Sequence, residues 1–249
     1  MKKALLAMGC LVMASSTQVA FADGEAAGEK ASPISITLSV TSDYRFRGQS
    51  QNSRNPAVQG SFDYSADNGI FAGVWASNID FSDTGDTESF MEGDIYVGYN
   101  FDISEGTTGA VKATYYYYPE QPGGVDYDYL EGQLSLSHAL HDATLTAELN
   151  YSPDYFGGSG SAVAVAAGIE HPLWGKMSAS GHVGHQWIDD NATFGSDDYL
   201  YWDLGVGIDF GRLDIDARYV GTNLSDAECF GGTNLCEAGF VATASISFP

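Results

Sequence analysis

Charged side chains recur at positions from which they could face one another across a passage. Arg45 and Arg47 lie near the start of the chain, and Arg218 lies near its end. Glu92 and Asp94 lie between them and carry the opposite charge. A basic arc facing an acidic arc sets a field across a passage, which favours small zwitterionic or dipolar solutes over apolar ones. The residues predicted to line such a passage are Asp43, Arg45, Arg47, Glu92, Asp94, Lys112, Glu131, Asp203, Asp216 and Arg218.

An alternative interpretation of the same charges is that they pair within a wall. A salt bridge such as Arg218 with Asp203 would stiffen the structure without selecting a solute, and paired charges are ordinary in polar barrel interiors. The sequence leaves both interpretations open.

Other kinds of chemistry find little support. No glycine-rich loop follows a strand and opens a helix, as nucleotide binding requires, and no Gly-x-Ser-x-Gly motif is present. His182 and His185 fall on opposite faces of one predicted strand, which disfavours a shared metal ion. A nucleophile cannot be assembled beside a histidine base. We therefore expect no catalytic residue, no cofactor, no metal site and no enzymatic activity, and a membrane-embedded hydrolase is the least favoured function.

The stretch 34–47 indicates which element must position these charges. Its apolar residues take positions 34, 36, 38, 40, 44 and 46, and polar or charged residues take the odd positions. Side chains of a strand alternate faces, so this pattern predicts one apolar face and one wet face. The apolar face is long enough to cross a bilayer, for which a tilted strand needs only ~9–11 residues. A one-residue slip would turn the basic residues toward lipid at ~2–4 kcal/mol each.

Similar segments follow along the whole chain, and the links between them alternate mostly between long and short. About twelve strands are expected, an even number that returns both ends of a barrel to the same side. The link 100–109 is the exception, because it is long where a short one is expected. The fold class is therefore all-β, a transmembrane antiparallel up-and-down β-barrel. The predicted strands are 34–47, 58–64, 70–81, 91–99, 111–118, 128–137, 143–151, 162–170, 177–187, 200–210, 213–219 and 240–248.

Outward-facing aromatic residues fall near the predicted strand ends, as the girdles of a membrane barrel do. A soluble β-sandwich, the alternative, would place aromatics at strand centres as often as at ends. Twelve strands enclose a gap on the order of 10 Å, open to small solutes if no loop fills it. The predicted girdles are Tyr44, Phe46, Phe81, Tyr117, Tyr151, Trp187, Trp202, Tyr219 and Phe240 at one rim, and Phe62, Tyr64, Phe71, Tyr99, Phe210 and Phe248 at the other.

The N-terminus predicts export. Two lysines, a short apolar run and an Ala-x-Ala site indicate a signal peptide over residues 1–22, cleaved after Ala22. Residues 23–33 are expected to form a flexible periplasmic tail, and residues 34–249 the barrel. The chain is therefore expected in a bacterial outer membrane, among lipid and lipopolysaccharide. The formal net charge of −23 argues against nucleic acid as a partner.

The mature chain keeps two cysteines, Cys229 and Cys236, close together in a predicted loop. Export to an oxidising compartment favours a disulfide between them. A metal site would need further ligands, and no histidine lies close in sequence.

Several motifs resemble a known family, the TorF-type porins, also called the Gcw_chp family of outer-membrane proteins. The resemblance covers nearly the whole mature chain and implies a barrel and a porin function, but it assigns no binding or catalytic residue. One departure is Pro249, which follows Phe248 where such proteins usually end on an aromatic residue. The matching stretches are 43–48, 55–60, 69–78, 92–99, 116–119 and the loop of Asn223, Cys229 and Cys236.

The function expected from these observations is passive diffusion of small polar or zwitterionic solutes across the outer membrane. The alternative is a plugged barrel with a structural role or a role in binding through its loops.

Overall fold

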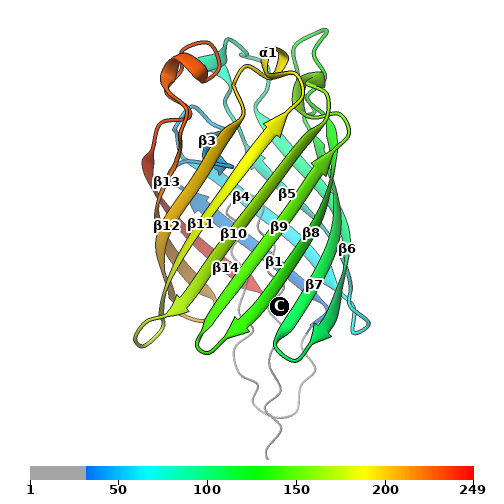
Figure 1. Ribbon diagram of the computed structural model, residues 1–249, viewed down its shortest axis with the longest axis vertical. Helices are drawn as coiled ribbons and strands as arrows, with labels where there is room; N and C mark the ends of the chain where they lie inside the picture. Colours follow the sequence, from blue (N-terminus) through cyan, green and yellow to red (C-terminus); the bar gives the residue numbers. More distant parts are fainter. Residues whose placement is uncertain (1–31) are drawn as a thin grey trace, which may run out of the picture.

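The computed structural model describes residues 32–249, and these form a closed antiparallel barrel of twelve strands (Figure 1). Each strand pairs with its neighbours along the chain, and the first and last strands pair with each other to close the barrel. The predicted signal peptide and nearly all of the predicted tail lie outside the described residues. The strands are β1 (Ile34–Thr41), β4 (Ala57–Ser65), β5 (Ile70–Asn78), β6 (Met91–Ser104), β7 (Thr107–Tyr117), β8 (Tyr129–Leu140), β9 (Ala143–Ser152), β10 (Ala162–Pro172), β11 (Met177–Ile188), β12 (Tyr199–Asp209), β13 (Leu213–Thr222) and β14 (Gly239–Phe248).

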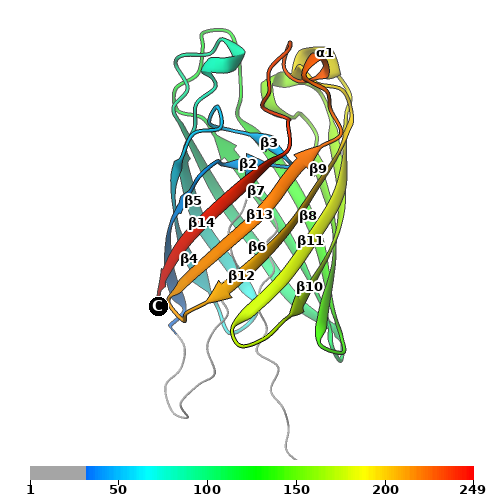
Figure 2. The same ribbon diagram turned by 90° about the vertical axis from the view of Figure 1, so that its left-hand side faces the viewer.

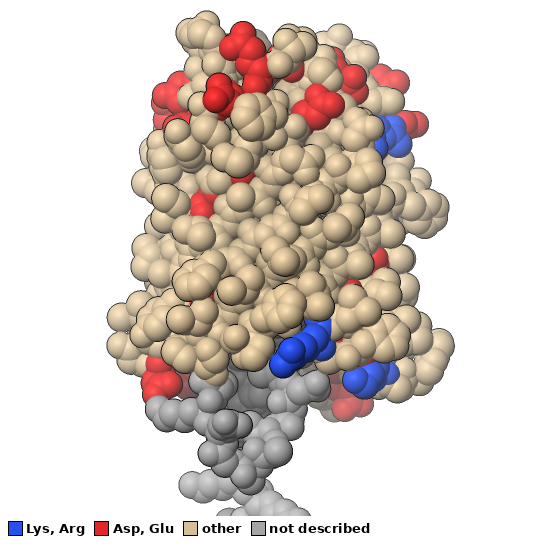
Figure 3. All heavy atoms as spheres, turned by 180° about the vertical axis from the view of Figure 1, so that it is seen from behind, with Lys and Arg blue, Asp and Glu red and all other residues tan. Residues whose placement is uncertain are grey.

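The alternation that predicted the strands decides which side chains face out. In β1, Leu38 and Val40 are about half exposed, whereas Ser39 and Thr41 are buried in the interior. The other strands repeat this pattern, so an apolar band surrounds the barrel, and charged side chains gather above and below it (Figure 3). Such a band fits hydrocarbon better than water. The predicted fold class is confirmed.

Long loops lie at one end of the barrel and tight turns at the other, as the sequence predicted. The link 100–109 is no exception in the structure, because β6 and β7 extend until only residues 105 and 106 connect them. The loop end carries the short helices η1 (Ser82–Thr84), η2 (Phe156–Gly158), η3 (Asp226–Glu228) and α1 (Asn191–Phe194). Among residues 32–249, no helix is long and apolar enough to cross a membrane.

The first strand, predicted over residues 34–47, is shorter in the structure. β1 ends at Thr41, and residues 42–56, here called the in-folded segment, turn into the barrel. This segment contains a small hairpin, β2 (Arg45–Phe46) and β3 (Gln49–Ser50), which lies within the barrel outline toward the loop end (Figure 2). Arg47 and Gly48 form its two-residue turn with φ of 46° and 85°, the signs that a type I′ hairpin turn requires.

Four aromatic residues predicted at the lipid-facing rims are instead inside: Tyr44 and Phe46 on the in-folded segment, Phe71 on β5, and Phe81 beyond it. Phe71 can turn inward because Gly98 on the paired strand has no side chain in the space that its ring occupies. The outward positions are correct for Tyr117, Tyr151, Trp187, Tyr219, Phe240, Phe62, Tyr64, Tyr99, Phe210 and Phe248.

Candidate functional site

The interior of the barrel is the candidate site, and its half near the long loops (the loop half) is filled with aromatic rings. Tyr44 has no exposed surface and meets Trp75 edge-on, with ring centroids 5.4 Å apart. Phe46 meets Tyr116 in the same manner at 5.9 Å. These rings bring the in-folded segment into contact with the walls formed by β5 and β7.

More rings from the walls and the long loops complete this aromatic core. Tyr116 stacks on Tyr129 at 4.2 Å, and Tyr155 packs edge-on against Tyr129. The gap expected from the strand number is therefore filled in this half. An open passage was expected only if no loop fills the interior, and here that condition is not met. The buried members of the core are Tyr44, Phe46, Ala57, Trp75, Ile79, Phe81, Tyr116, Tyr118, Tyr129, Tyr155, Ala162, Ile188, Phe194 and Tyr199.

Arg47 extends from the hairpin turn to the barrel wall. Its Nη2 donates to both carboxylate oxygens of Glu131 on β8, at 2.7 Å each. Its Nη1 donates to Oε1 of Gln186 on β11 at 2.8 Å. The guanidinium also lies 4.7 Å from the ring centroid of Phe46. Because both partners are buried, this is a largely desolvated, charge-assisted ion pair between the segment and the wall.

Arg45 has a different set of partners, all in loops. Its Nε donates to Asp43 Oδ2 at 2.5 Å, and its Nη1 donates to the carbonyls of Gly48, Leu235 and Glu237 at 3.0, 3.2 and 2.9 Å. Arg45 thus ties the hairpin to the last long loop.

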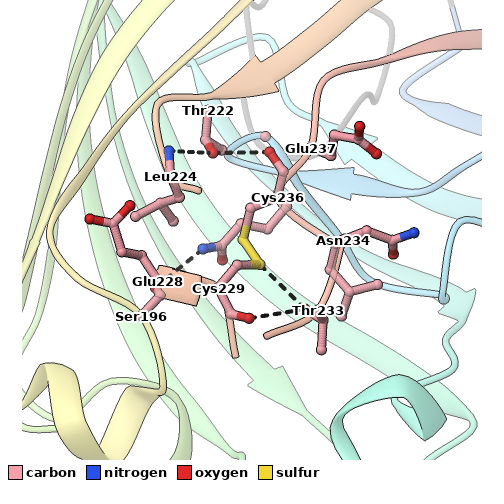
Figure 4. The surroundings of a disulfide bond; sticks show 12 residues. Ser196, Thr222, Leu224, Glu228, Cys229, Thr233, Asn234, Cys236 and Glu237 are labelled. Carbon is pink, nitrogen blue, oxygen red and sulfur yellow. Dashed lines mark hydrogen bonds between the residues drawn. A yellow bond between two sulfur atoms is a disulfide. The ribbon is translucent and has the colours of Figure 1, made fainter. Parts of the chain in front are cut away.

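The last long loop contains the predicted disulfide between Cys229 and Cys236, which the structure confirms (Figure 4). Both cysteines and Leu235 are almost fully buried. Thr222 at the end of β13 donates from its hydroxyl to the Cys236 carbonyl at 3.0 Å. The loop is therefore fixed at Cys236, which lies between the two residues whose carbonyls bind Arg45.

Buried acidic residues line the wall beside the in-folded segment. Glu92 on β6 accepts a hydrogen bond from the Tyr44 hydroxyl at 3.1 Å. Asp94 lies two residues further along the same inward face. Lys112 on β7 lies 6.0 Å from the ring centroid of Tyr96. Glu148 on β9, which the sequence did not single out, is also buried and accepts from Gln133 Nε2 at 3.4 Å.

Arg218 on β13 lies in a separate charge network near the middle of its strand, and its partner Asp216 lies in the half near the tight turns (the turn half). It donates to Asp216 from Nε at 2.8 Å and from Nη2 at 3.0 Å, and it also pairs with Asp203 on β12. His182 Nδ1 lies 2.9 Å from Asp203 Oδ1. Gly205 makes room for this arrangement, since a side chain there would collide with Arg218. This network agrees with the interpretation, left open by the sequence, that the charges pair with one another within the wall.

The turn half is otherwise polar and partly exposed. Thr37 and Ser247 lie opposite each other on β1 and β14, with their hydroxyl oxygens 3.1 Å apart. The turn half therefore retains more contact with solvent than the aromatic core of the loop half does. Inward residues of this kind include Ser35, Thr37, Ser61, Ser137, Thr144, Ser178, Ser180 and Ser247.

The predicted charges are therefore all in the interior but do not form two opposing arcs. Arg45 and Arg47 come from the in-folded segment rather than from the wall, and Arg218 is held by its own acidic neighbours. Among the described residues, no group of three histidine, cysteine or acidic side chains is arranged to hold a metal ion.

Sequence reasoning missed the inward aromatic core and the hairpin that brings Arg47 to Glu131. Two signals could have indicated them. The run Gln49–Asn52 is polar on both faces, which does not suit a wall strand, and Arg47-Gly48 can take the turn of a two-residue hairpin, whose second position favours glycine.

The fold and interior define a porin-like barrel, and the chain belongs to the Gcw_chp family. The model of that family, described as bacterial protein of unknown function, matches residues 25–248. Membership is confirmed, whereas the TorF-type name stays a prediction, because the description gives no function. No curated protein matches the chain.

Solved porin structures share this fold. The KdgM porin superposes with a TM-score of 0.56 at 6% identity, covering 86% of this chain and 98% of its own. The NanC porin also gives 0.56, at 10% identity, covering 87% and 99%. A second KdgM structure contains disordered oligogalacturonate. At such low identities the likeness shows the fold alone.

Proposed function

We propose that this protein is an outer-membrane channel for the passive diffusion of small polar or zwitterionic solutes, held narrow or closed at rest by the in-folded segment. The observation that carries the proposal is the division of the interior. The turn half is polar and partly exposed, as a water-filled passage needs. The loop half is filled by the in-folded segment together with aromatic rings from the walls and the other long loops, and this segment is not itself a strand of the wall.

The apolar band supports a location in lipid, and the acidic loop end would share divalent cations with lipopolysaccharide phosphates. The predicted signal peptide would deliver the chain to the outer membrane. On this proposal, the residues that line the path are the ten interior charges predicted from the sequence. The chemistry is transport, with no enzymatic step.

The charge balance of the interior bears on the solute. Of the ten predicted lining residues, six are acidic and four are basic. Oligogalacturonate, present in one KdgM structure, is a polyanion, and an acidic excess would repel it. We therefore extend the porin function to this chain but not that solute class.

Planar-bilayer conductance of the purified protein tests the proposal. Wild type is expected to show low or infrequent conductance. A variant in which residues 43–52 are replaced by a glycine-serine linker is expected to conduct steadily, because Tyr44 and Arg47 no longer fill the loop half. Replacement of residues 122–126, in an exposed loop, is the matched control and should behave as wild type.

The second candidate is a plugged barrel with a structural or loop-mediated binding role, favoured by the dense packing around Tyr44. The same recordings decide between the two. If the linker variant folds as a barrel, shown by its heat-dependent gel mobility, and still carries no current, the channel proposal is wrong.

A further inference from the structure

The barrel wall contains a site built for a guanidinium group, and the chain's own Arg47 occupies it. Glu131 presents both carboxylate oxygens to one nitrogen of the group, Nη2, and Gln186 presents its amide oxygen to another, Nη1. These two wall residues come from different strands, β8 and β11. Glu131 and Gln186 thus accept from two different nitrogens of one planar group, which the single nitrogen of a lysine-type ammonium does not offer.

Beside the occupied site lie buried polar atoms that have no hydrogen-bond partner among the described residues. They are Nε2 of Gln186, the hydroxyl of Tyr199 and Oε1 of Glu148, and all three side chains are more than nine-tenths buried. Gln186 and Tyr199 are paired across β11 and β12, and Glu148 interacts electrostatically with Arg47. Buried polar groups without partners are unfavourable. A ligand that supplied hydrogen-bond partners for them would therefore bind more favourably.

The spare groups complement an amino acid rather than a bare guanidinium. Two hydrogen-bond donors, from Gln186 and Tyr199, suit a carboxylate, and the free oxygen of Glu148 suits an ammonium group. A metal ion does not fit, since no metal-binding group of three acidic, histidine or cysteine side chains exists in residues 32–249.

Arg47 is attached in a manner that allows competition. It sits at the tip of a two-residue turn, and it is attached to the wall only through the end of its side chain, which donates to Glu131 and Gln186 and also interacts with Tyr155 and Tyr201. A tethered group competes at an effective concentration in the millimolar range or above, so a free solute at comparable concentration can replace it.

From this geometry we propose that Glu131 and Gln186, with Glu148 and Tyr199 beside them, form a binding site for guanidinium-bearing amino acids such as arginine, and that Arg47 occupies it as a tethered mimic of that solute. The binding claim depends only on the wall. Its consequence for transport, that the solute displaces Arg47 and loosens the in-folded segment, rests on the proposed function.

Isothermal titration calorimetry of the detergent-purified mature chain tests the site with arginine and with citrulline, which has the same shape without the charge. Arg47→Ala vacates the site, so it should bind arginine at least about tenfold more tightly than citrulline, as expected for charge-assisted hydrogen bonds. Wild type should bind arginine more weakly than Arg47→Ala does. Adding Glu131→Gln to Arg47→Ala should abolish the preference. Arg212→Ala, which removes an exposed arginine at a tight turn, should match wild type.

Arg47→Met keeps the apolar stem against Phe46 and serves if Arg47→Ala does not fold. Equal binding of arginine and citrulline, or binding of neither, by wild type and by each variant that folds would overturn the site. Since the titration involves no current, a silent bilayer would contradict the channel and leave the site standing, whereas a conducting protein without arginine preference would do the reverse.

Discussion

The loop half and the turn half of the barrel interior are lined by the same strands but differ in what they bury. In the loop half, Tyr44 and Glu92 have almost no exposed surface and contact each other. In the turn half, Thr37 and Ser247 keep partial access to solvent. One end of the cylinder is thus packed as a protein core is, and the other end is a wet vestibule.

The difference teaches that a barrel's strand number sets only the space available inside. Whether that space is open depends on what fills it, and here a loop with its own aromatic and basic side chains packs against aromatic rings of the walls and the other long loops. Charge pairs illustrate the same contrast. Arg47 pairs with Glu131 with less than a tenth of either side chain exposed, whereas Arg218 is shared between Asp203 and Asp216 with about a fifth of its side chain exposed.

The largest effect is expected from Tyr44→Ala, which empties the centre of the loop half. Loss of a fully buried aromatic side chain should lower the free energy of unfolding by about 3–5 kcal/mol. Urea unfolding in detergent micelles measures this change. Tyr151→Ala, at an outward position, is the matched control and should be far milder; comparable losses would mean that the loop half is not a packed core.

Glu131→Gln should come next, at about 3 kcal/mol, because it leaves the Arg47 guanidinium buried without its counter-charge. The equivalent change in the turn half, Asp216→Asn, should be clearly smaller, since Arg218 keeps Asp203 and partial hydration. Urea unfolding of both variants gives the comparison directly. Equal losses would contradict the assignment of one pair to a dry environment and the other to a wet one.

Removal of the disulfide by Cys229→Ser with Cys236→Ser should cost about 2 kcal/mol or less, because the closed loop is short. The effect should be local and should reach Arg45 and Ser50, which bond to the Leu235 carbonyl. Amide hydrogen exchange should therefore quicken over residues 45–50 and 229–237 but not in β8. Uniform protection in the variant would show that the last loop does not hold the hairpin.

The smallest effect is expected in the vestibule. Thr37→Val removes the hydroxyl contact with Ser247, and because both side chains stay partly hydrated the loss should be about 0.5 kcal/mol. Unfolding of this variant beside Ser39→Val, whose hydroxyl is buried against Ser245 at 2.8 Å, should rank the buried position as the more costly. A larger loss for Thr37→Val than for Ser39→Val would contradict the conclusion that the Thr37 hydroxyl is the more hydrated of the two.

Strand positions were predictable because the side chains of a membrane-type wall must alternate between apolar outward and polar inward positions. In strands such as β9 and β14, only one of the two possible assignments of faces satisfies that rule. The disulfide was predictable because only two cysteines follow the predicted signal peptide, and they lie close together in sequence. The in-folded segment was not, because residues 42–47 continue the alternation of β1 and only the turn at Arg47 and Gly48 reverses the chain. Phe71 and Phe81 misled for a related reason, since an aromatic residue near a strand end suits a lipid rim and an aromatic core equally well.

Charge pairing was harder still to predict. The partner of Arg47 lies 84 residues away in sequence, and nothing local distinguishes a wall arginine from one on a returning hairpin. The position of Glu148 could have been inferred from the phase of β9, but its proximity to Arg47 depends on where the segment folds.

Cysteine labelling with a membrane-impermeant maleimide tests the division of the interior most directly. Ser178→Cys lies in the turn half and is partly exposed, whereas Ser152→Cys lies in the loop half at a position with no exposed surface. In proteoliposomes of known orientation, Ser178→Cys should react from the side of the tight turns and Ser152→Cys should stay unlabelled. Labelling of Ser152→Cys from the loop side as fast as Ser178→Cys from the turn side would contradict a packed loop half.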